Sequence, residues 1–272
     1  MEIKYLQNLT IESKKIFNNF KKENVLNSDT LKLMFSPEYK YRGKKANTFL
    51  VQSLATGKPA AITAKYAFTK NINKAFNVCY ETHQYNFFDK LKNELGYKYF
   101  YIQYNLNKPH IKSMLVGFMN TVAAHDAYRG LGVREDEIQI KAALDNNIKS
   151  IPRSAVGSAT LYHTKMGFLP TQDNLIEVKS EFDVERYTKQ LAKTSLDIKE
   201  QNFRPLIIRN SGKYYIDVNQ TQAVANVAEI KDRIKEGYSA TDLSYLELDA
   251  VAMKLSGQEL EYWRSLIYNP HS

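Results

Sequence analysis

Hydrophobic and polar positions along this chain follow two different periods, and the period changes several times. Residues 2–6 alternate in the manner of a short strand, and a helical spacing of apolar residues follows from Thr10 to Phe20. A second short helix is predicted over 28–35, because Pro37 pushes the preceding backbone out of the helical region. The chain is therefore expected to open with a strand and two helices.

Two runs rich in β-branched and aromatic residues come next, at 46–52 and 60–68. The turn formers of Thr56–Pro59 separate them, so we predict an antiparallel hairpin. Aromatic residues then return at helical spacing, and Gly96 provides a natural helix end, which predicts a helix over 71–95.

The rest of the chain alternates between predicted strands and helices. Up to residue 170 we predict strands at 97–104 and 112–122, a glycine turn, a helix over 135–147, a strand at 149–153 and a helix over 158–166. Beyond it we predict a helix near 184–192, a hairpin of 205–209 and 214–218, and helices near 222–236 and 241–255.

This order of elements is that of a mixed α/β fold. We expect an α/β (α+β) domain over 1–175 with a mixed, mainly antiparallel sheet flanked by helices. Residues 176–272 would form an added, mostly helical module with a β-hairpin.

The charge balance favours anionic partners. The chain has 272 residues, enough for a sizeable core, and its formal net charge is +9 with a pI near 9.3. Nucleic acid, an acidic membrane surface and a phosphorylated cofactor would all suit such a charge. The lysines are spread over most of the chain and form only short clusters such as Lys14-Lys15 and Lys44-Lys45, so a dedicated nucleic-acid binder with a long basic arm is not expected.

The numbers and spacing of cysteines and histidines limit which disulfides and metal sites this chain can form. The single cysteine, Cys79, excludes an intrachain disulfide and a Cys-rich zinc site. The five histidines show no metal-ligand spacing, so no metal is expected. The first residues lack an apolar signal segment and no apolar run reaches membrane-spanning length, which predicts a soluble, cytoplasmic protein and leaves signal-independent export open.

Two stretches carry the candidate chemistry. Tyr128–Arg134 places glycines at 130 and 132 between an apolar run and a charged helical pattern, as in a strand-to-helix turn whose N–H groups face an anion. Leu161–Pro170 ends a helix at Gly167 and continues as an extended segment. The first stretch predicts a phosphate cradle, although a plain turn would have the same composition.

These residues, in this order of elements, resemble the GNAT family of N-acyltransferases over about residues 1–170. The family's acyl-CoA loop has Gln or Arg, two free positions, Gly, one free position, then Gly or Ala. Arg129, Gly132 and Arg134 fall on these places. The last is a departure, because a long side chain there must swing aside or pair with a phosphate itself.

The resemblance implies an acyl-CoA site. Its phosphate loop would be Arg129, Gly130, Leu131, Gly132, Val133 and Arg134, and its pantetheine-binding strand would include Val122, Ala123 and Ala124. The family admits pantetheine where the strand before the loop separates from its neighbour. Acetyl-CoA is the donor most expected, with another acyl-CoA as the variant.

The resemblance also implies catalytic residues. Alignment on Gly167-Phe168 places the family's acid tyrosine on His163, and Tyr162 is one residue earlier, so either would protonate the departing thiolate. His125 is the preferred base for the attacking amine. Glu81 and His83, on the predicted helix over 71–95, are alternatives for it.

The function expected from these residues is transfer of an acyl group from acyl-CoA to an amine on a small molecule or a protein. Two other readings stay open. Cys79 near a helix start would suit a cysteine hydrolase or transferase, with His110, His125 or His163 as base and Asp173 as its orienter. A non-catalytic binding protein would use the basic surface, with 246–253 and 262–267 as docking or core segments.

Overall fold

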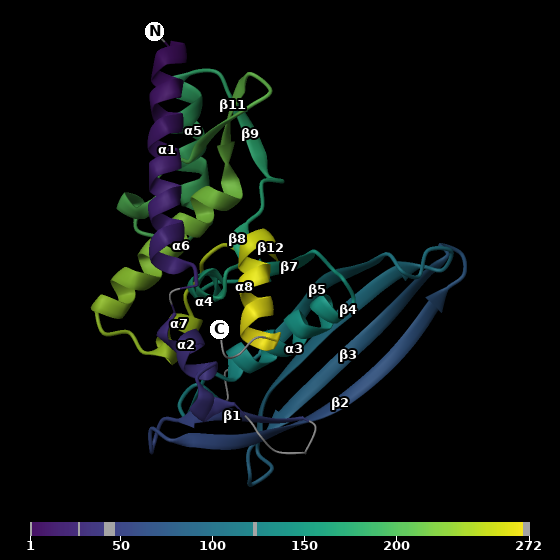
Figure 1. Cartoon of the computed structure of the whole chain (residues 1–272). Coiled ribbons are helices and arrows are strands. Elements are labelled where there is room, and N and C mark those ends of the chain that lie inside the picture. The colour runs from purple at the N-terminus through teal and green to yellow at the C-terminus, as the bar shows by residue number, and fades with distance from the viewer. Residues whose placement is uncertain (1, 27, 41–46, 122–123, 269–272) are drawn as a thin grey trace. The chain divides into compact units, whose positions relative to one another are not determined.

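The structure is a computed structural model that describes residues 2–26, 28–40, 47–121 and 124–268 (Figure 1). The chain divides into two compact units, each built from separate stretches. The first unit contains residues Met1–Asn27 and Ser154–Lys254, and the second contains Ser28–Arg153 and Leu255–Ser272. The boundary expected near residue 175 falls inside the first unit.

The second unit is organised around a six-stranded sheet in the order β5-β4-β3-β2-β1-β6, and its neighbouring strands are antiparallel. The mixed α/β class with a mainly antiparallel sheet is confirmed. The strands are β1 (Thr48–Ser53), β2 (Pro59–Asn73), β3 (Val78–Phe88), β4 (Glu94–Asn105), β5 (Lys112–Asn120) and β6 (Tyr128–Arg129).

The helix expected over residues 71–95 is wrong. Val78–Phe88 is strand β3, which pairs along its whole length with β2 and with β4. Its aromatic residues alternate between the two faces of the sheet, and one face buries Phe87 of β3 and, further along, Phe100 and Ile102 of β4. Pairing with two neighbours therefore outweighed a weak local helical pattern.

Helices of the second unit pack on this sheet and on each other (Figure 1). They are α2 (Asp29–Met34), η1 (Pro37–Tyr39), α3 (Leu131–Asp145) and α8 (Gly257–Tyr268). Trp263 of α8 is fully buried and meets the ring of Phe35 edge-on, with the centroids 5.4 Å apart. The late segment 262–267 thus contributes to a core.

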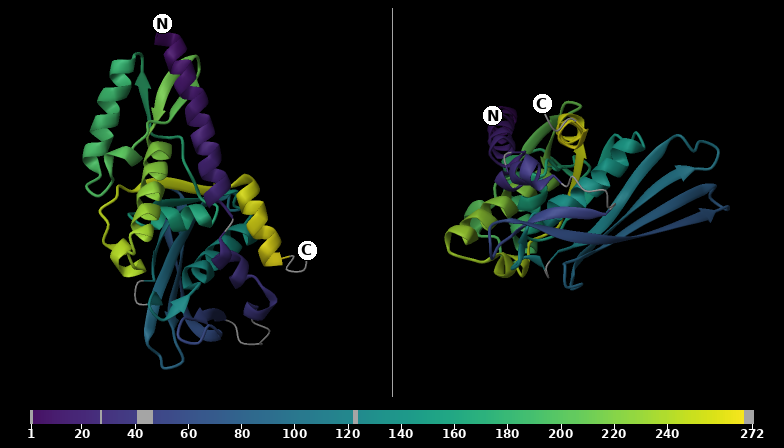
Figure 2. Two further views of the ribbon diagram at one scale, coloured as in Figure 1. Left: turned by 90° about the vertical axis from the view of Figure 1, so that its left-hand side faces the viewer. Right: turned by 60° about the horizontal axis from the view of Figure 1, so that its bottom comes forward.

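The first unit begins with α1 (Glu2–Asn24), so the strand expected at residues 2–6 is wrong. Leu6, Ser13 and Phe20 are buried at a spacing of seven residues, which is two helical turns. Figure 2 shows α1 beside the sheet of β9 (Leu175–Val178), β10 (Ile207–Asn210) and β11 (Lys213–Asp217). The Ser13 hydroxyl accepts a hydrogen bond from the N–H of Ile207 at 2.7 Å, which fixes the helix to the strand.

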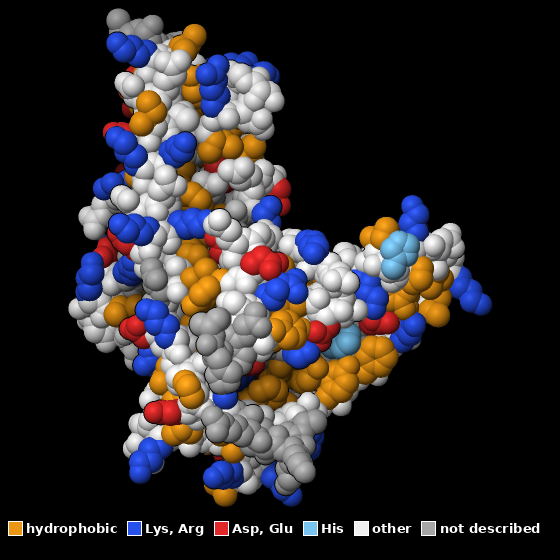
Figure 3. All heavy atoms as spheres, viewed as in Figure 1, with side chains coloured by type: hydrophobic (Ala, Val, Ile, Leu, Met, Phe, Trp, Pro, Cys, Tyr) orange, Lys and Arg blue, Asp and Glu red, His pale blue; other side chains and the backbone are white. Residues whose placement is uncertain are grey.

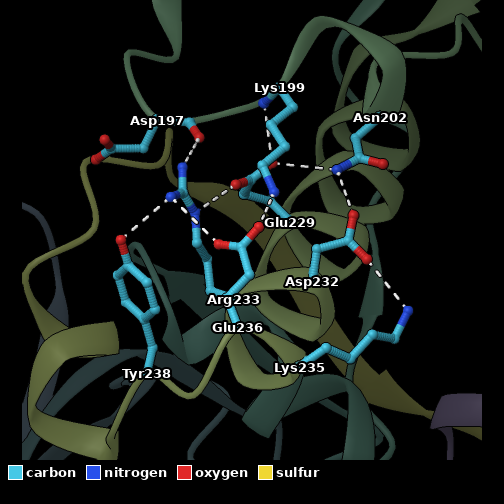
Figure 4. Close-up of polar contacts among 9 residues, drawn as sticks. All are labelled: Asp197, Lys199, Asn202, Glu229, Asp232, Arg233, Lys235, Glu236 and Tyr238. Carbon is cyan, nitrogen blue, oxygen red and sulfur yellow. Dashed lines mark hydrogen bonds and ion pairs between the residues drawn. The ribbon is translucent and has the colours of Figure 1, made fainter.

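The predicted hairpin of the C-terminal part is confirmed as β10 and β11, and the helices before and after it are confirmed as α5 (Glu181–Thr194) and α6 (Val218–Lys235). A polar network ties α6 to the segment after α5 (Figure 4). The fully buried Glu229 bonds the side chain of Arg233 at 2.7 Å and the N–H of Lys199 at 2.9 Å. It also accepts from Asn202 at 3.1 Å.

A three-stranded sheet, ordered β7-β12-β8, contains the borders between the two units. Its strands are β7 (Ser150–Ala155), β8 (Leu169–Pro170) and β12 (Val251–Ser256). The helix expected over 241–255 is wrong, because α7 (Ala240–Ser244) is short and β12 follows it. Val251, Met253 and Leu255 are all buried, and this period of two is that of a strand.

None of the helices in the described part of the chain is long and apolar enough to cross a membrane.

Candidate functional site

The glycine turn lies in the second unit, between β6 and α3. Gly130 has a φ of 96°, in the left-handed region, and caps the first turn of α3. A β-carbon at this position would lie 2.1 Å from Sδ of Met34, which is fully buried. Gly130 is therefore required by the packing of α2 on the turn as well as by its backbone angle.

Arg134 turns its side chain into the protein. Its Nε donates to the carbonyl of Leu50 at 2.9 Å, and Nη2 donates to those of Met34 at 2.6 Å and Tyr39 at 2.9 Å. Its Nη1 pairs with Glu137 at 2.7 Å. Of the two alternatives for this long side chain, the structure has the one in which it swings aside.

Arg129, the first residue of the predicted loop motif, is exposed. Its Nε donates to the Thr30 hydroxyl at 2.9 Å. The intervening Leu131 and Val133 are buried. The turn thus buries the side chains of Leu131 and Val133, leaves Gly130 and Gly132 partly exposed, and has the exposed cationic side chain of Arg129 beside it.

The segment before the turn is not a strand throughout. β5 ends at Asn120, and the N–H of Ala124 donates to the carbonyl of Thr121 at 2.9 Å in a helical turn. The strand expected to reach Ala124 is therefore wrong at this residue. Val122 and Ala123 lie outside the described residues.

His125 sits in this helical turn. One ring nitrogen, Nε2, lies 3.1 Å from the Thr121 hydroxyl. The other, Nδ1, is buried and has no hydrogen-bond partner among the described residues. Which of the two ring nitrogens carries the proton depends on the tautomer, because the Thr121 hydroxyl can donate to Nε2 or accept from it.

Tyr162 and His163 lie on α4 (Ala159–Lys165), in the first unit, whereas the glycine turn lies in the second. The helix ends as expected, with Gly167 at a φ of 92° and the N–H of Phe168 bonded to the carbonyl of His163 at 3.0 Å. His163 is 3% exposed and its ring contacts those of Tyr162 and Phe168. Tyr162 is only half-buried.

Sequence reasoning missed a buried charge cluster beneath α3. Asp136 Oδ1 lies 3.1 Å from Nζ of Lys98 and 2.8 Å from Nη2 of Arg153, and all three side chains are at most 4% exposed. Gln139 accepts from the same Arg153 nitrogen at 2.8 Å. In the sequence, the charged run Arg134–Glu137 looks like a solvated helix face. The structure shows that Arg134, Glu135 and Asp136 are instead buried.

Two groups in this cluster have strongly perturbed ionisation. Burial lowers the pKa of Lys98 to about 8, with the charge of Arg153 acting in the same direction. Burial raises the pKa of the Glu135 carboxyl well above its usual value, and neither of its oxygens has a hydrogen-bond partner among the described residues. Burial thus disfavours the charged form of Glu135.

The same cluster connects two strands that belong to different sheets. Arg153 of β7 donates to Sδ of Met119 on β5 at 3.2 Å, and Lys98 of β4 lies 3.7 Å from the same sulfur. β5 is the outermost strand of the six-stranded sheet, and β7 belongs to the three-stranded sheet. The two strands approach through side chains and do not share a backbone ladder.

Cys79 and the alternative bases lie on β3. Cys79 is fully buried within the strand, so the expected position near a helix start is wrong. Glu81 accepts from the Tyr104 hydroxyl at 3.1 Å, and His83 Nδ1 lies 2.9 Å from the hydroxyl of Tyr66. Burial lowers the pKa of His83. Within the described ranges, no group of three or more His, Cys, Asp or Glu residues is placed to hold a metal ion.

The chain was compared with protein-family models, with curated proteins and with solved structures, and no significant match was found in any of them.

Proposed function

We propose that this protein is an acyl-CoA-dependent N-acyltransferase of GNAT type, with acetyl-CoA as the most favoured donor. The observation that carries the proposal is the separation of β5 from β7. These strands approach where Arg153 contacts Met119, yet they belong to different sheets. The family admits pantetheine between two strands that separate, and α3, which the glycine turn opens, contributes Asp136 to the cluster at Arg153.

The start of α3 supports the binding of a pyrophosphate. A left-handed Gly130 leads into a helix of 15 residues, and the N–H groups of a helix's first turn favour an anion together with its dipole. Arg134 is bound to backbone carbonyls and Glu137, so it does not occupy the cradle. Phosphate oxygens would be held mainly by backbone N–H groups.

The proposed chemistry is direct transfer. The neutral amine nitrogen attacks the thioester carbonyl carbon, the new C–N bond forms and the C–S bond breaks. The hydroxyl of Tyr162 gives its proton to the departing CoA sulfur, and His125 accepts the proton of the amine, directly or through water. Tyr162 is preferred to His163 as the acid because His163 is 3% exposed, whereas Tyr162 is half-buried.

Binding and turnover are tested separately. Acetyl-CoA at millimolar concentration should raise the melting temperature of the full chain, because it stabilises the native state by mass action. Release of free CoA is then measured with small amines and with lysine-containing peptides as acceptors. Absence of a melting shift in folded protein, or a shift without CoA release from any acceptor, would refute the transferase proposal.

Tyr162→Phe tests the acid. Turnover should fall about 100-fold or more while the melting shift with acetyl-CoA is unchanged, because the hydroxyl acts only in the transition state. Tyr245→Phe is the matched control, since Tyr245 is 78% exposed in the same unit. Equal turnover in both variants would remove Tyr162 from the mechanism and assign the acid role to His163.

A further inference from the structure

The two faces of the large sheet differ in what covers them. Figure 3 is viewed from the side of α3, where hydrophobic side chains gather along the strands beside that helix. Lys98, Phe100 and Ile102 on β4 point to the face beneath α3 and are all buried. Their sequence neighbours point the opposite way, because successive strand residues alternate between faces. We call this second surface the distal face and define it by Tyr97, Tyr99, Tyr101 and Phe118.

The four rings of the distal face form one connected, partly exposed group. Tyr97 and Tyr99 stack 6.3 Å apart with planes 3° from parallel, and Tyr99 stacks on Phe118 at 5.8 Å and 12°. Tyr101 meets Tyr99 edge-on at 5.7 Å. Phe118 is 56% exposed and the tyrosines are half-buried. Flat rings held nearly parallel at a surface can stack with other planar groups.

Uncharged hydrogen-bonding side chains lie beside these rings. The register of β3 against β4 places Asn86 opposite Tyr97 and Gln84 opposite Tyr99. The two amides are joined at 3.0 Å, and Lys65 of β2 is opposite Asn86. Amides can donate to and accept from the edges of nucleobases, and a lysine can pair with phosphate.

The charge of this region is strongly positive. The second unit has 20 Lys and Arg residues against 12 Asp and Glu, a formal net charge of +8, whereas the first has 18 against 17. Residues 59–120, which include β2 to β5, contain eight lysines and three acidic residues. One of the three, Glu81, is paired with Lys70 and Lys112.

The other two acidic residues of this region already have hydrogen-bond partners. Glu94, at the start of β4, accepts from the Asn86 side chain at 3.4 Å. Asp89 accepts hydrogen bonds from the backbone N–H and the side chain of Asn93, in the turn that joins β3 to β4. Lys90 and Lys92 are exposed in the same turn, at the end of β4 that contains Tyr97. The partner expected on charge grounds is therefore an anion.

We propose that the distal face binds single-stranded nucleic acid. Successive bases stack on Tyr97, Tyr99 and Phe118, and phosphates pair with Lys65, Lys90 and Lys92. Aromatic side chains beside cationic ones are the usual basis of sequence-tolerant binding to single strands. No long basic arm is needed here, because stacking supplies much of the affinity.

The experiment measures binding of the full chain to a fluorescent oligouridylate of about 20 nucleotides, with a duplex and a sulfated polysaccharide as competitors. Tyr99→Ala should weaken binding about tenfold or more, since one stacked base is lost. Phe76→Ala is the matched control, because Phe76 is 75% exposed in the turn between β2 and β3 and should bind as the parent does.

Salt dependence separates stacking from simple charge attraction. Lys65→Gln should lower the slope of log affinity against log salt by about 0.7, and Tyr99→Ala should leave that slope unchanged. The proposal is overturned if folded protein does not bind the oligouridylate at low salt. It is also overturned if Tyr99→Ala binds like the parent, or if duplex and polysaccharide compete as well as the single strand does.

Discussion

Substitution of Gly130 by alanine is expected to destabilise the second unit severely. The position has a φ of 96°, and the left-handed region costs an alanine about 1–2 kcal/mol. The new β-carbon would also lie 2.1, 2.8 and 2.9 Å from the Sδ, Cγ and Cε atoms of Met34. Met34 is fully buried and has little room to yield, so overpacking adds about 1–3 kcal/mol.

The expected loss in the free energy of unfolding of Gly130→Ala is therefore about 2–5 kcal/mol. It is measured by urea unfolding of the full chain, followed by the fluorescence of Trp263, which is buried in the same unit. Gly57→Ala is the matched control. Its φ is 67° and nothing lies within 4 Å of an added β-carbon, so it should lose only the backbone part.

A double substitution isolates the steric part. Met34→Ala alone should cost about 2–5 kcal/mol through its cavity, but it also removes the atoms that an alanine at 130 would strike. The double variant should then be more stable than the sum of the two single effects by about 1–3 kcal/mol. Strict additivity, or a loss at Gly130 no larger than at Gly57, would refute the reasoning.

Three further outcomes are expected. Asp136→Ala leaves Lys98 and Arg153 as buried cations and should lower the free energy of unfolding in urea by about 3–5 kcal/mol. The control, Asp145→Ala, breaks an exposed pair on the same helix and should lower it by under about 1 kcal/mol. Equal losses would contradict this. Burial raises the pKa of Asp217 from 3.8 to about 6. The protonated carboxyl therefore stabilises the folded state fully below pH 3.8, and this contribution is lost as pH rises through 6. Asp217→Asn keeps an acceptor for the N–H of Gln220 and should be more stable than the parent at pH 7 by roughly 3 kcal/mol, with the difference closing near pH 4; a difference that is constant with pH would exclude this account. Glu229→Ala removes the acceptor that holds Lys199 and Asn202, so limited proteolysis should cut faster between 196 and 203, and an unchanged cutting rate would show that the network does not hold the segment.

The elements that sequence predicted well are those whose local pattern and tertiary environment agree. The hairpin of β1 and β2 has β-branched residues on both sides of a turn, and α6 buries apolar residues such as Ala223, Val227 and Ile230 at helical spacing. The prediction for β3 was wrong because its aromatic residues also fit a helical spacing. The segment forms a strand because it pairs along its length with β2 and β4. Pairing with the strands before and after it cannot be read from the spacing of apolar residues within one segment.

The parts of the candidate site that depend on local backbone chemistry could be predicted, and those that depend on distant contacts could not. The turn at Gly130 and the helix end at Gly167 follow from local backbone chemistry, and both occur as expected. The orientation of Arg134 depends on carbonyls of residues 34, 39 and 50, and these lie far from it in the sequence. The charges of Glu135 and Asp136 likewise look solvated until the helix is placed on its sheet.

The discontinuous make-up of the two units has a consequence for biosynthesis. The first unit needs residues up to 254, and the second buries Trp263 of α8 in its core. Neither unit can therefore close while the ribosome is still translating the middle of the chain. Trp263, which packs against Phe35, is made about 140 residues later than β5 ends, so the core of the second unit stays incomplete over that interval and its apolar surface is exposed to aggregation.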